Sequence, residues 1–231
     1  MKSTNTAAAA TAALQKIANP QKAITYRGYF KECGDDIFLG VTTPLMRAVA
    51  KEFRDLPLPQ IRLLMSSRIH DERSLAHAIL RLRFEKGSED EQERIFDFYV
   101  KNRKFIRSWD GVDDSAPYIA GRFLLNRDKK LLYDLIVSEN IWDRRIALVT
   151  TWWFIRNGRI DDTLKLVQLV LKDNEDLIHK AAGWMLREAG KRDAGALKGF
   201  LKTHGKSMPR TMLRYAIERF PEAERKTYLR S

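Results

Sequence analysis

A basic residue followed two positions later by alanine recurs at a nearly constant interval in the second half of the chain. The three copies are Arg145-Ile146-Ala147, Lys180-Ala181-Ala182 and Arg214-Tyr215-Ala216, which are 35 and 34 residues apart. Each copy comes early in a helical segment that follows a shorter apolar one. A repeating helix pair of about 30–45 residues is typical of an α-solenoid, in which each unit buries its apolar face against its neighbours. Chance recurrence of a short triplet is the alternative.

The rest of the sequence also favours helices. Twelve glycines and seven prolines in 231 residues are fewer than average usage, and both residues are unfavourable in helix interiors. Apolar residues recur at intervals of three and four, as in Leu75, Ile79 and Leu82. No segment alternates strictly, and Asp110-Gly111 lacks the β-branched flanks of a hairpin. We therefore predict an all-α fold, an α-solenoid of helix pairs that is curved and has a basic concave face.

Capping residues predict where helices begin and end. Proline in the first turn starts a helix at Thr43-Pro44, and Asp71 is expected to cap a helix over 72–86. Further caps are expected at Ser88, Asp128, Asp161 and Asn174, and helix stops at Gly87, Gly158, Gly190 and Gly205.

The charge balance indicates the class of partner. Forty-two Lys and Arg against 30 Asp and Glu give a net charge of +12, so we expect a polyanion, nucleic acid first and an anionic membrane surface second. The basic residues are spread along the helical segments, and a merely solvated face is the alternative. In a solenoid, Arg145, Lys180 and Arg214 would align into a stripe that follows a phosphate backbone.

Several classes of protein are disfavoured. No run reaches the ~18 apolar residues of a membrane span, and one cysteine, Cys33, allows no internal disulfide or cysteine-based zinc site. Residues 1–18 are rich in alanine and lack a leucine-rich secretory core. We expect them to form a tail or first helix before a single domain over 19–231, in a cytoplasmic protein.

The usual catalytic motifs are not found. The four histidines include no pair four residues apart, so we expect surface or capping roles and no metal site. The chain also lacks a glycine-rich phosphate loop and a nucleophile elbow.

Tryptophans and a carboxylate suggest another chemistry. Trp109 and Asp113 are four residues apart and share a face if this segment is helical. The alternative is that Trp109 anchors a loop and Asp113 caps a helix. Trp184 shares a segment with several cations, whereas Trp142, Trp152 and Trp153 are expected in the core. Aromatic faces attract cations, and a carboxylate stabilises developing positive charge. These residues are therefore suited to bind a cation that forms on DNA.

Three motifs resemble one protein family. They are Ser108-Trp109-Asp110-Gly111-Val112-Asp113, the segment from Asn140 to Arg145, and the segment from Lys180 to Glu188. Together with Tyr29 to Pro44, they resemble the AlkD-type DNA alkylation repair family over about residues 19–220. The resemblance implies a monomeric DNA glycosylase built from HEAT-like repeats. Such an enzyme excises N3-methyladenine and N7-methylguanine from duplex DNA without metal, cofactor or lyase lysine, and leaves the lesion stacked.

The same resemblance implies roles for individual residues. Trp109 and Trp184 would flank the damaged nucleotide, and Asp113 would be the catalytic carboxylate. The resemblance also implies that Arg145 binds phosphate near the lesion and that Tyr29 completes the pocket. The other residues that we expect to bind DNA are Thr42, Thr43, Lys180, Arg187, Lys191 and Arg214. Ser108 and an insertion around Gly34-Asp35-Asp36 depart from the family pattern. A non-catalytic module that binds damaged or branched DNA, and a protein-interaction scaffold, are the alternative functions.

Overall fold

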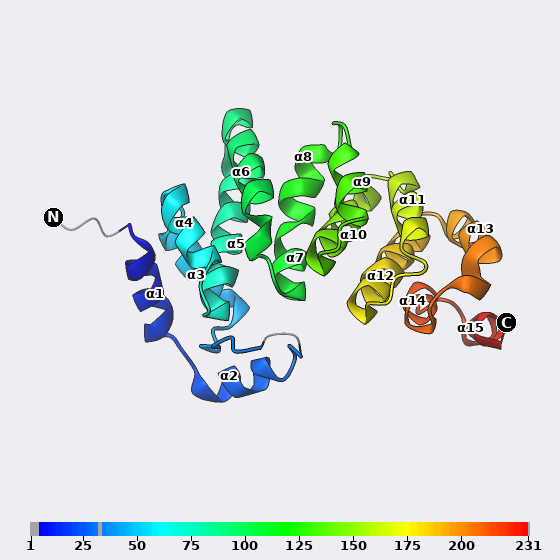
Figure 1. Ribbon diagram of the computed structural model, residues 1–231, viewed down its shortest axis with the longest axis horizontal. Helices are drawn as coiled ribbons and strands as arrows, with labels where there is room; N and C mark the ends of the chain where they lie inside the picture. Colours follow the sequence, from blue (N-terminus) through cyan, green and yellow to red (C-terminus); the bar gives the residue numbers. More distant parts are fainter. Residues whose placement is uncertain (1–4, 32–33, 231) are drawn as a thin grey trace. The chain divides into compact units, whose positions relative to one another are not determined.

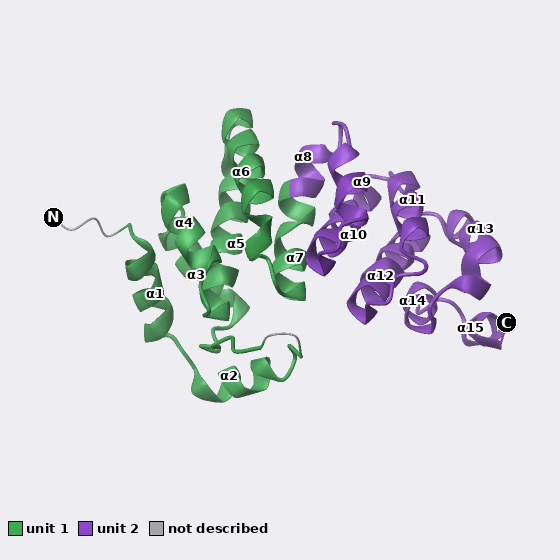
Figure 2. Ribbon diagram, viewed as in Figure 1, with its two compact units in different colours: residues 1–119 green, residues 120–231 purple. Residues whose placement is uncertain are grey.

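The computed structural model describes residues 5–31 and 34–230, so Cys33 lies outside the described residues (Figure 1). The chain forms two compact units, Met1–Ile119 and Ala120–Ser231, coloured separately in Figure 2. The described residues contain helices and no strand, with one isolated bridge between Ile37 and Ile69. The all-α prediction is therefore confirmed. None of the described helices has the length and apolar character needed to cross a membrane.

Unit 1 is organised around one long helix, α5 (His70–Lys86). Leu75, Ala76, Ile79 and Leu80 of α5 are completely buried, which reflects the spacing of three and four seen in the sequence. The neighbours that pack on α5 are α1 (Ala7–Lys16), α3 (Thr43–Glu52), α4 (Leu58–Met65), α6 (Glu89–Asn102) and α7 (Trp109–Ser115). The unit also contains α2 (Pro20–Arg27) and the 3-10 turn η1 (Arg103–Phe105). The predicted boundary at residue 18 remains a prediction.

Unit 2 is a stack of helix pairs. Its central helices, α10 (Ile141–Arg156), α12 (Asp176–Arg192) and α14 (Arg210–Ala216), pack against one another in chain order. Helices α9 (Lys130–Ile136), α11 (Asp161–Leu169) and α13 (Ala194–His204) come before them in sequence. The remaining elements are the π-helical turn Pro117–Gly121, which leads into the unit, α8 (Arg122–Leu124), η3 (Gly205–Ser207) and α15 (Glu222–Arg230).

The sequence repeat is also a structural repeat. Arg145, Lys180 and Arg214 are each the fifth residue of their helix. The alanine two positions later is buried in every copy, because it faces the neighbouring helix of the stack. Equivalent register in three successive helices favours a true repeat over chance recurrence.

Gly183 allows α12 and α14 to approach closely. A Cβ atom at this position would lie 2.5 Å from the Met212 carbonyl oxygen and 2.5 Å from the Tyr215 Cβ. These distances are too short for any side chain, so the glycine sets the separation of the two helices.

The predicted helix ends are partly right. Ser88 caps α6 by accepting from the Glu91 amide, Gly87 and Gly205 follow α5 and α13, and Gly158 follows α10 with a φ of 76°. Asp128 accepts from the Lys130 amide at 2.8 Å, just before α9. The N-cap of α3 is Thr42, so the cap predicted at Thr43 is one residue late.

Four other end predictions are wrong. Asp71 lies inside the first turn of α5, where its carboxylate binds another segment. Gly190 lies inside α12, because the helix continues to Arg192 and packs Gly190 against Leu197. Asp161 is the first residue of α11 and Asn174 precedes the cap of α12, Glu175.

Candidate functional site

Trp109 and Asp113 lie one turn apart on α7, as the helical alternative predicted. Ser108 is the N-cap residue, Trp109 begins the helix and Asp113 is half-buried. Gly111 faces α5: a Cβ atom there would lie 3.0 Å from the ring of His77. The small residue in the motif lets the first turn of α7 pack against the core.

A cavity of about 530 Å³ opens beside Trp109 in unit 1. Phe30 stacks on Trp109 with a centroid separation of 4.9 Å and an interplanar angle of 12°. Phe38 packs on Phe30 at 5.4 Å, and the exposed Tyr29 also lines the cavity. The structure therefore brings Trp109, Tyr29 and Thr43 of the predicted set to one cavity, whereas Asp113 is not among the residues that line it.

Carboxyl groups line the same cavity. The His70 imidazole Nε2 lies 2.8 Å from the Asp110 carboxylate. Burial opposes ionisation of Asp110 most strongly, but the hydrogen bond and charge of His70 outweigh it and lower the Asp110 pKa. Asp114 is a cavity residue that sequence reasoning did not select, and part of its surface remains exposed. Desolvation at the cavity wall, followed by the negative charge of Asp110, raises its pKa. The sequence feature that could have indicated Asp114 is its position directly after Asp113.

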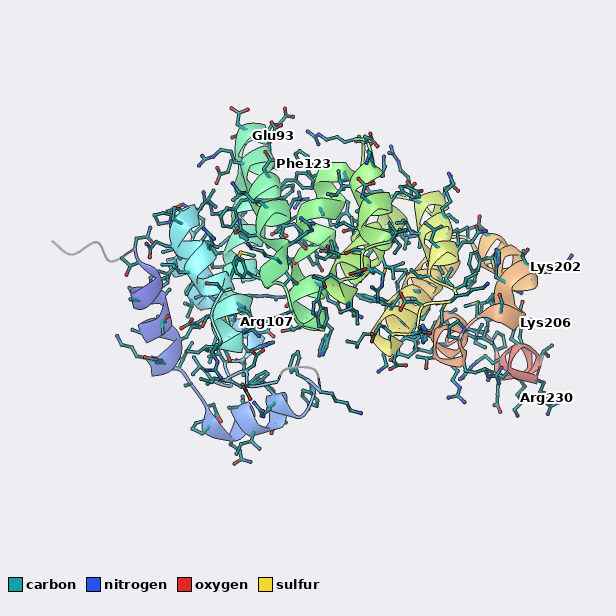
Figure 3. All side chains as sticks on the ribbon, in the orientation of Figure 1. Glu93, Arg107, Phe123, Lys202, Lys206 and Arg230 are labelled. Atoms are coloured by element: carbon teal, nitrogen blue, oxygen red, sulfur yellow. The ribbon has the colours of Figure 1, made fainter. Side chains whose placement is uncertain are left out.

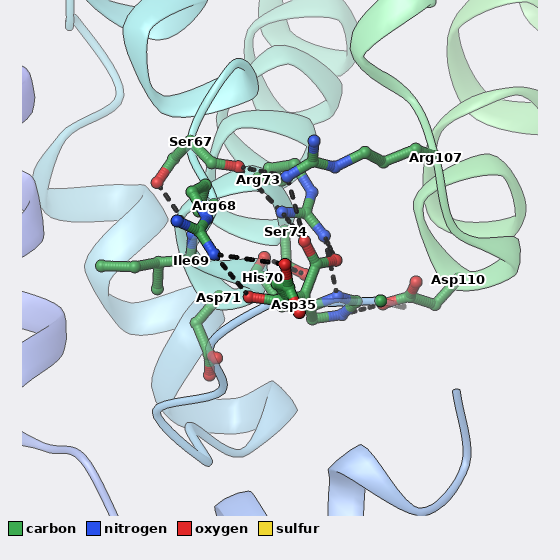
Figure 4. A network of polar contacts seen from close by, with 12 residues as sticks. Asp35, Ser67, Arg68, Ile69, His70, Asp71, Arg73, Ser74, Arg107 and Asp110 are labelled. Carbon is green, nitrogen blue, oxygen red and sulfur yellow. Dashed lines mark hydrogen bonds and ion pairs between the residues drawn. The ribbon is translucent and has the colours of Figure 1, made fainter. Parts of the chain in front are cut away.

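A buried polar network supports this cavity (Figure 4). The Asp36 carboxylate accepts from Arg73 and, at 3.0 Å, from Arg107. Both guanidinium groups also donate to the Ser67 carbonyl oxygen, at 2.8 and 3.0 Å. Burial, the largest influence, lowers the Arg73 pKa despite the neighbouring Asp36. The insertion around Gly34-Asp35-Asp36 is thus anchored to α5 and to the segment before α7.

Asp71 fixes the chain that follows the insertion. Its two carboxylate oxygens accept from the backbone amides of Leu39 and Val41, each at 2.8 Å. Together with the Asp36 network, this arrangement holds Phe38 in the wall of the cavity.

Two histidines correct the expectation of surface or capping roles. His70 and His77 retain only 7% and 2% of their surface, because both lie on α5 where α7 covers it. Burial lowers the His77 pKa to about 4. Neither ring nitrogen of His77 has a hydrogen-bond partner among the described residues.

Thr42 is the N-cap of α3 in unit 1, and the other predicted residues belong to unit 2. Arg145 is buried and donates to the Leu177 carbonyl oxygen at 2.8 Å. Three of the predicted cations pair with carboxylates: Lys180 with Asp176, Lys191 with Glu188, and Arg187 with Glu218 and Glu188. Trp184 is half-buried on α12, and Arg214 is exposed on α14. Because Trp109 and Asp113 belong to unit 1, the predicted meeting of these residues with Trp184 remains a proposal.

Trp142, Trp152 and Trp153 are partly exposed, so the prediction of core positions is wrong. Trp152 and Trp153 instead contact the guanidinium groups of Arg156 and Arg122. Among residues 5–31 and 34–230, no group of three or more His, Cys, Asp or Glu is placed to hold a metal ion.

Comparison with known proteins places this geometry in a family. The profile of a family described as DNA alkylation repair enzyme matches residues 10–220. The chain belongs to this family. A comparison with curated proteins finds no match.

A solved structure shares the fold of this DNA alkylation repair family member. It is described as a predicted DNA alkylation repair enzyme from Enterococcus faecalis, is 20% identical and superposes with a TM-score of 0.71. The match covers 89% of this chain and 97% of that chain. At this identity the likeness concerns the fold alone.

Proposed function

We propose that the protein is a DNA glycosylase that hydrolyses the N-glycosidic bond of N3-methyladenine and N7-methylguanine in duplex DNA. The observation that carries the proposal is that Trp109 lines an aromatic cavity and that Asp113 lies one turn after it on α7. Membership of the DNA alkylation repair family supports the same substrate class. The enzyme would act as a monomer and need no metal or cofactor.

The chemistry of these lesions suits an aromatic and anionic site. Alkylation at N3 or N7 gives the purine a positive charge and makes it a good leaving group without a general acid. Breaking the glycosidic bond then creates an oxocarbenium ion on the deoxyribose. Asp113 would stabilise this cation and orient the attacking water, while Trp109 and Trp184 would contact the sugar through their ring faces.

The DNA backbone would be held by residues from both units. In unit 2, the fifth-position cations Lys180 and Arg214 and the α12 cations Arg187 and Lys191 would contact phosphates. Arg145, the buried fifth residue of α10, would join them only by turning outward from the Leu177 carbonyl oxygen. Lys180, Arg187 and Lys191 would exchange their present carboxylate partners for phosphate oxygens. In unit 1, Tyr29, Thr42 and Thr43 would contact the backbone near the cavity.

Release of N7-methylguanine from methylated duplex DNA tests the proposal. Asp113→Asn keeps the size of the side chain but removes its charge, so we expect the rate to fall by about 10²–10³, or about 2.7–4 kcal/mol of barrier. Asp97→Asn, at an exposed position of α6, is the matched control and should retain the rate. Circular dichroism melting checks that both variants fold.

Two results would contradict the proposal in different ways. Equal release by wild type and Asp113→Asn would remove Asp113 from the mechanism. Tight duplex binding without release by the wild type would instead identify a non-catalytic module for damaged or branched DNA.

A further inference from the structure

A surface of unit 2 combines aromatic rings with guanidinium groups where α8 and α10 end. We call it the distal patch and define it by Arg122, Arg127, Trp152, Trp153, Arg156 and Arg159. Trp152 and Trp153 are partly exposed, with ring centroids 6.4 Å apart. Figure 3 labels Phe123, the α8 residue whose ring contacts the Arg127 guanidinium group.

Each aromatic ring of this surface contacts a guanidinium group. The Arg122 guanidinium lies 5.1 Å from the Trp153 ring centroid, and that of Arg156 lies 4.9 Å from the Trp152 centroid. Arg127 lies 4.1 Å from the centroid of Phe123. Such contacts orient the guanidinium planes, and Arg127 and Arg156 remain exposed to solvent.

Backbone carbonyl groups hold two of the four arginines of the distal patch. Arg159 donates to the Leu125 carbonyl oxygen at 2.6 Å, and Arg127 donates to that of Phe123 at 2.8 Å. A carbonyl oxygen fixes the position of a guanidinium group without carrying a full charge to cancel it. Arg127 and Arg159 are therefore pre-positioned by groups that do not offset their charge.

The predicted DNA-binding cations of α12 differ in this respect. Lys180 pairs with Asp176 at 2.8 Å and Lys191 with Glu188 at 2.7 Å, so a carboxylate offsets each charge. An anion that approaches the distal patch would not have to displace such a partner from Arg127 or Arg159 at the contacts described.

The distal patch is separate from the predicted phosphate-binding end of α10. Arg145 is the fifth residue of this helix, and Arg156 is its last. Eleven residues at 1.5 Å per residue separate them by about 16 Å along the helix axis. Arg156 and Trp152 therefore share a face of α10 with Arg145, and the distal patch lies about three helical turns farther along that face.

We propose that the distal patch is a second nucleic-acid site, which binds single-stranded DNA. Unpaired bases can stack on indole rings and on guanidinium planes while arginines contact the phosphates between them. In a duplex, base pairing and stacking cover the faces of the bases. A duplex could therefore contact the arginines through its phosphates but could not stack its bases on the indole rings. An acidic protein segment would likewise use the cations alone. The combination of both groups favours the single strand.

Binding of a fluorescent oligothymidylate of about 12 nucleotides to the full-length protein tests the proposal. Trp152→Leu keeps an apolar side chain but removes the stacking ring, so we expect the affinity to fall about fivefold or more, whereas Trp152→Phe should retain most of it. Arg156→Gln and Arg159→Gln keep N–H donors but lose the charge. Each should reduce the slope of log affinity against log salt by about 0.7.

Controls separate this site from the proposed glycosylase site. Lys202→Gln, at an exposed lysine of α13 labelled in Figure 3, should leave oligothymidylate affinity unchanged. The distal-patch variants should release N7-methylguanine from duplex DNA at the wild-type rate. Unchanged oligothymidylate affinity in Trp152→Leu and Arg156→Gln would overturn the proposal. A second result would also overturn the proposal. If a polyglutamate peptide bound as tightly as the oligonucleotide, and if Trp152→Leu did not change its affinity, the partner would be an acidic protein.

Discussion

Replacing Gly183 by alanine tests whether this residue sets the spacing of the helical stack in unit 2. The new Cβ would lie 2.5 Å from both the Met212 carbonyl oxygen and the Tyr215 Cβ. Ordinary contact begins near 3.4 Å, so α12 and α14 would have to separate by about 1 Å, or one of them would have to distort. The obstacle is backbone and the root of a side chain, neither of which can rotate away.

The magnitude follows from two opposing effects. Overpacking a close-packed contact costs up to about 3 kcal/mol, whereas alanine gains about 1 kcal/mol over glycine in a helix interior. The net loss is about 2 kcal/mol of unfolding free energy, which corresponds to a melting temperature lower by about 4–8 °C. Because Trp184 is the next residue, we also expect weaker alkylpurine release.

Gly199→Ala is the matched control. Gly199 lies inside α13, is exposed, and has no atom within 4 Å of the position that a Cβ would take. Here only the helix propensity changes, so the melting temperature should rise by about 2–4 °C. Both variants can be compared by circular dichroism or calorimetry. If Gly183→Ala is as stable as the wild type, the close approach of α12 and α14 does not depend on glycine.

Three further predictions concern pH, salt and metal. Burial lowers the His77 pKa from 6.5 to about 4. Between these two pH values the His77 imidazole is protonated in the unfolded chain but neutral in the folded protein. The unfolding free energy should therefore fall by at most about 3 kcal/mol as the pH drops from 6.5 to 4. Chemical denaturation of the wild type and of His77→Leu over this pH range checks this. Equal slopes of unfolding free energy against pH in the two proteins would refute it. Affinity for duplex DNA should fall steeply with salt, and Arg214→Ala should reduce the slope by about 0.9 if this exposed arginine contacts one phosphate. Release of N7-methylguanine should be unchanged by EDTA, and a loss that a divalent cation restores would contradict the metal-free mechanism.

Local patterns in the sequence predict the helices well because the information is contained in each segment. The repeat around Arg145, Lys180 and Arg214 even predicts equivalent positions in three helices. Gly190 and Asp71 show the limit of such patterns. Glycine often ends a helix and aspartate often caps one, but packing against Leu197 and binding to the Leu39 amide decide their actual places.

The candidate site could be predicted only in part. Spacing alone places Trp109 and Asp113 on one face of α7, since four residues make about one helical turn. The hydrogen bond between His70 and Asp110 joins residues 40 positions apart, and no local pattern indicates it. The same is true of the aromatic wall, because Phe30 meets Trp109 only through the tertiary fold.

The carboxylate of Asp36 couples the length of its loop to the charge of Arg73 on α5 and of Arg107 in the segment before α7. It is the counter-ion of Arg73 and Arg107, which follow it by 37 and 71 positions. A chain shortened at this loop would keep Arg73 in the interior with its charge unbalanced, which costs about 3–5 kcal/mol. Natural or engineered variants that lose the loop should therefore also carry an uncharged residue in place of Arg73, so that deletion and substitution are inherited together.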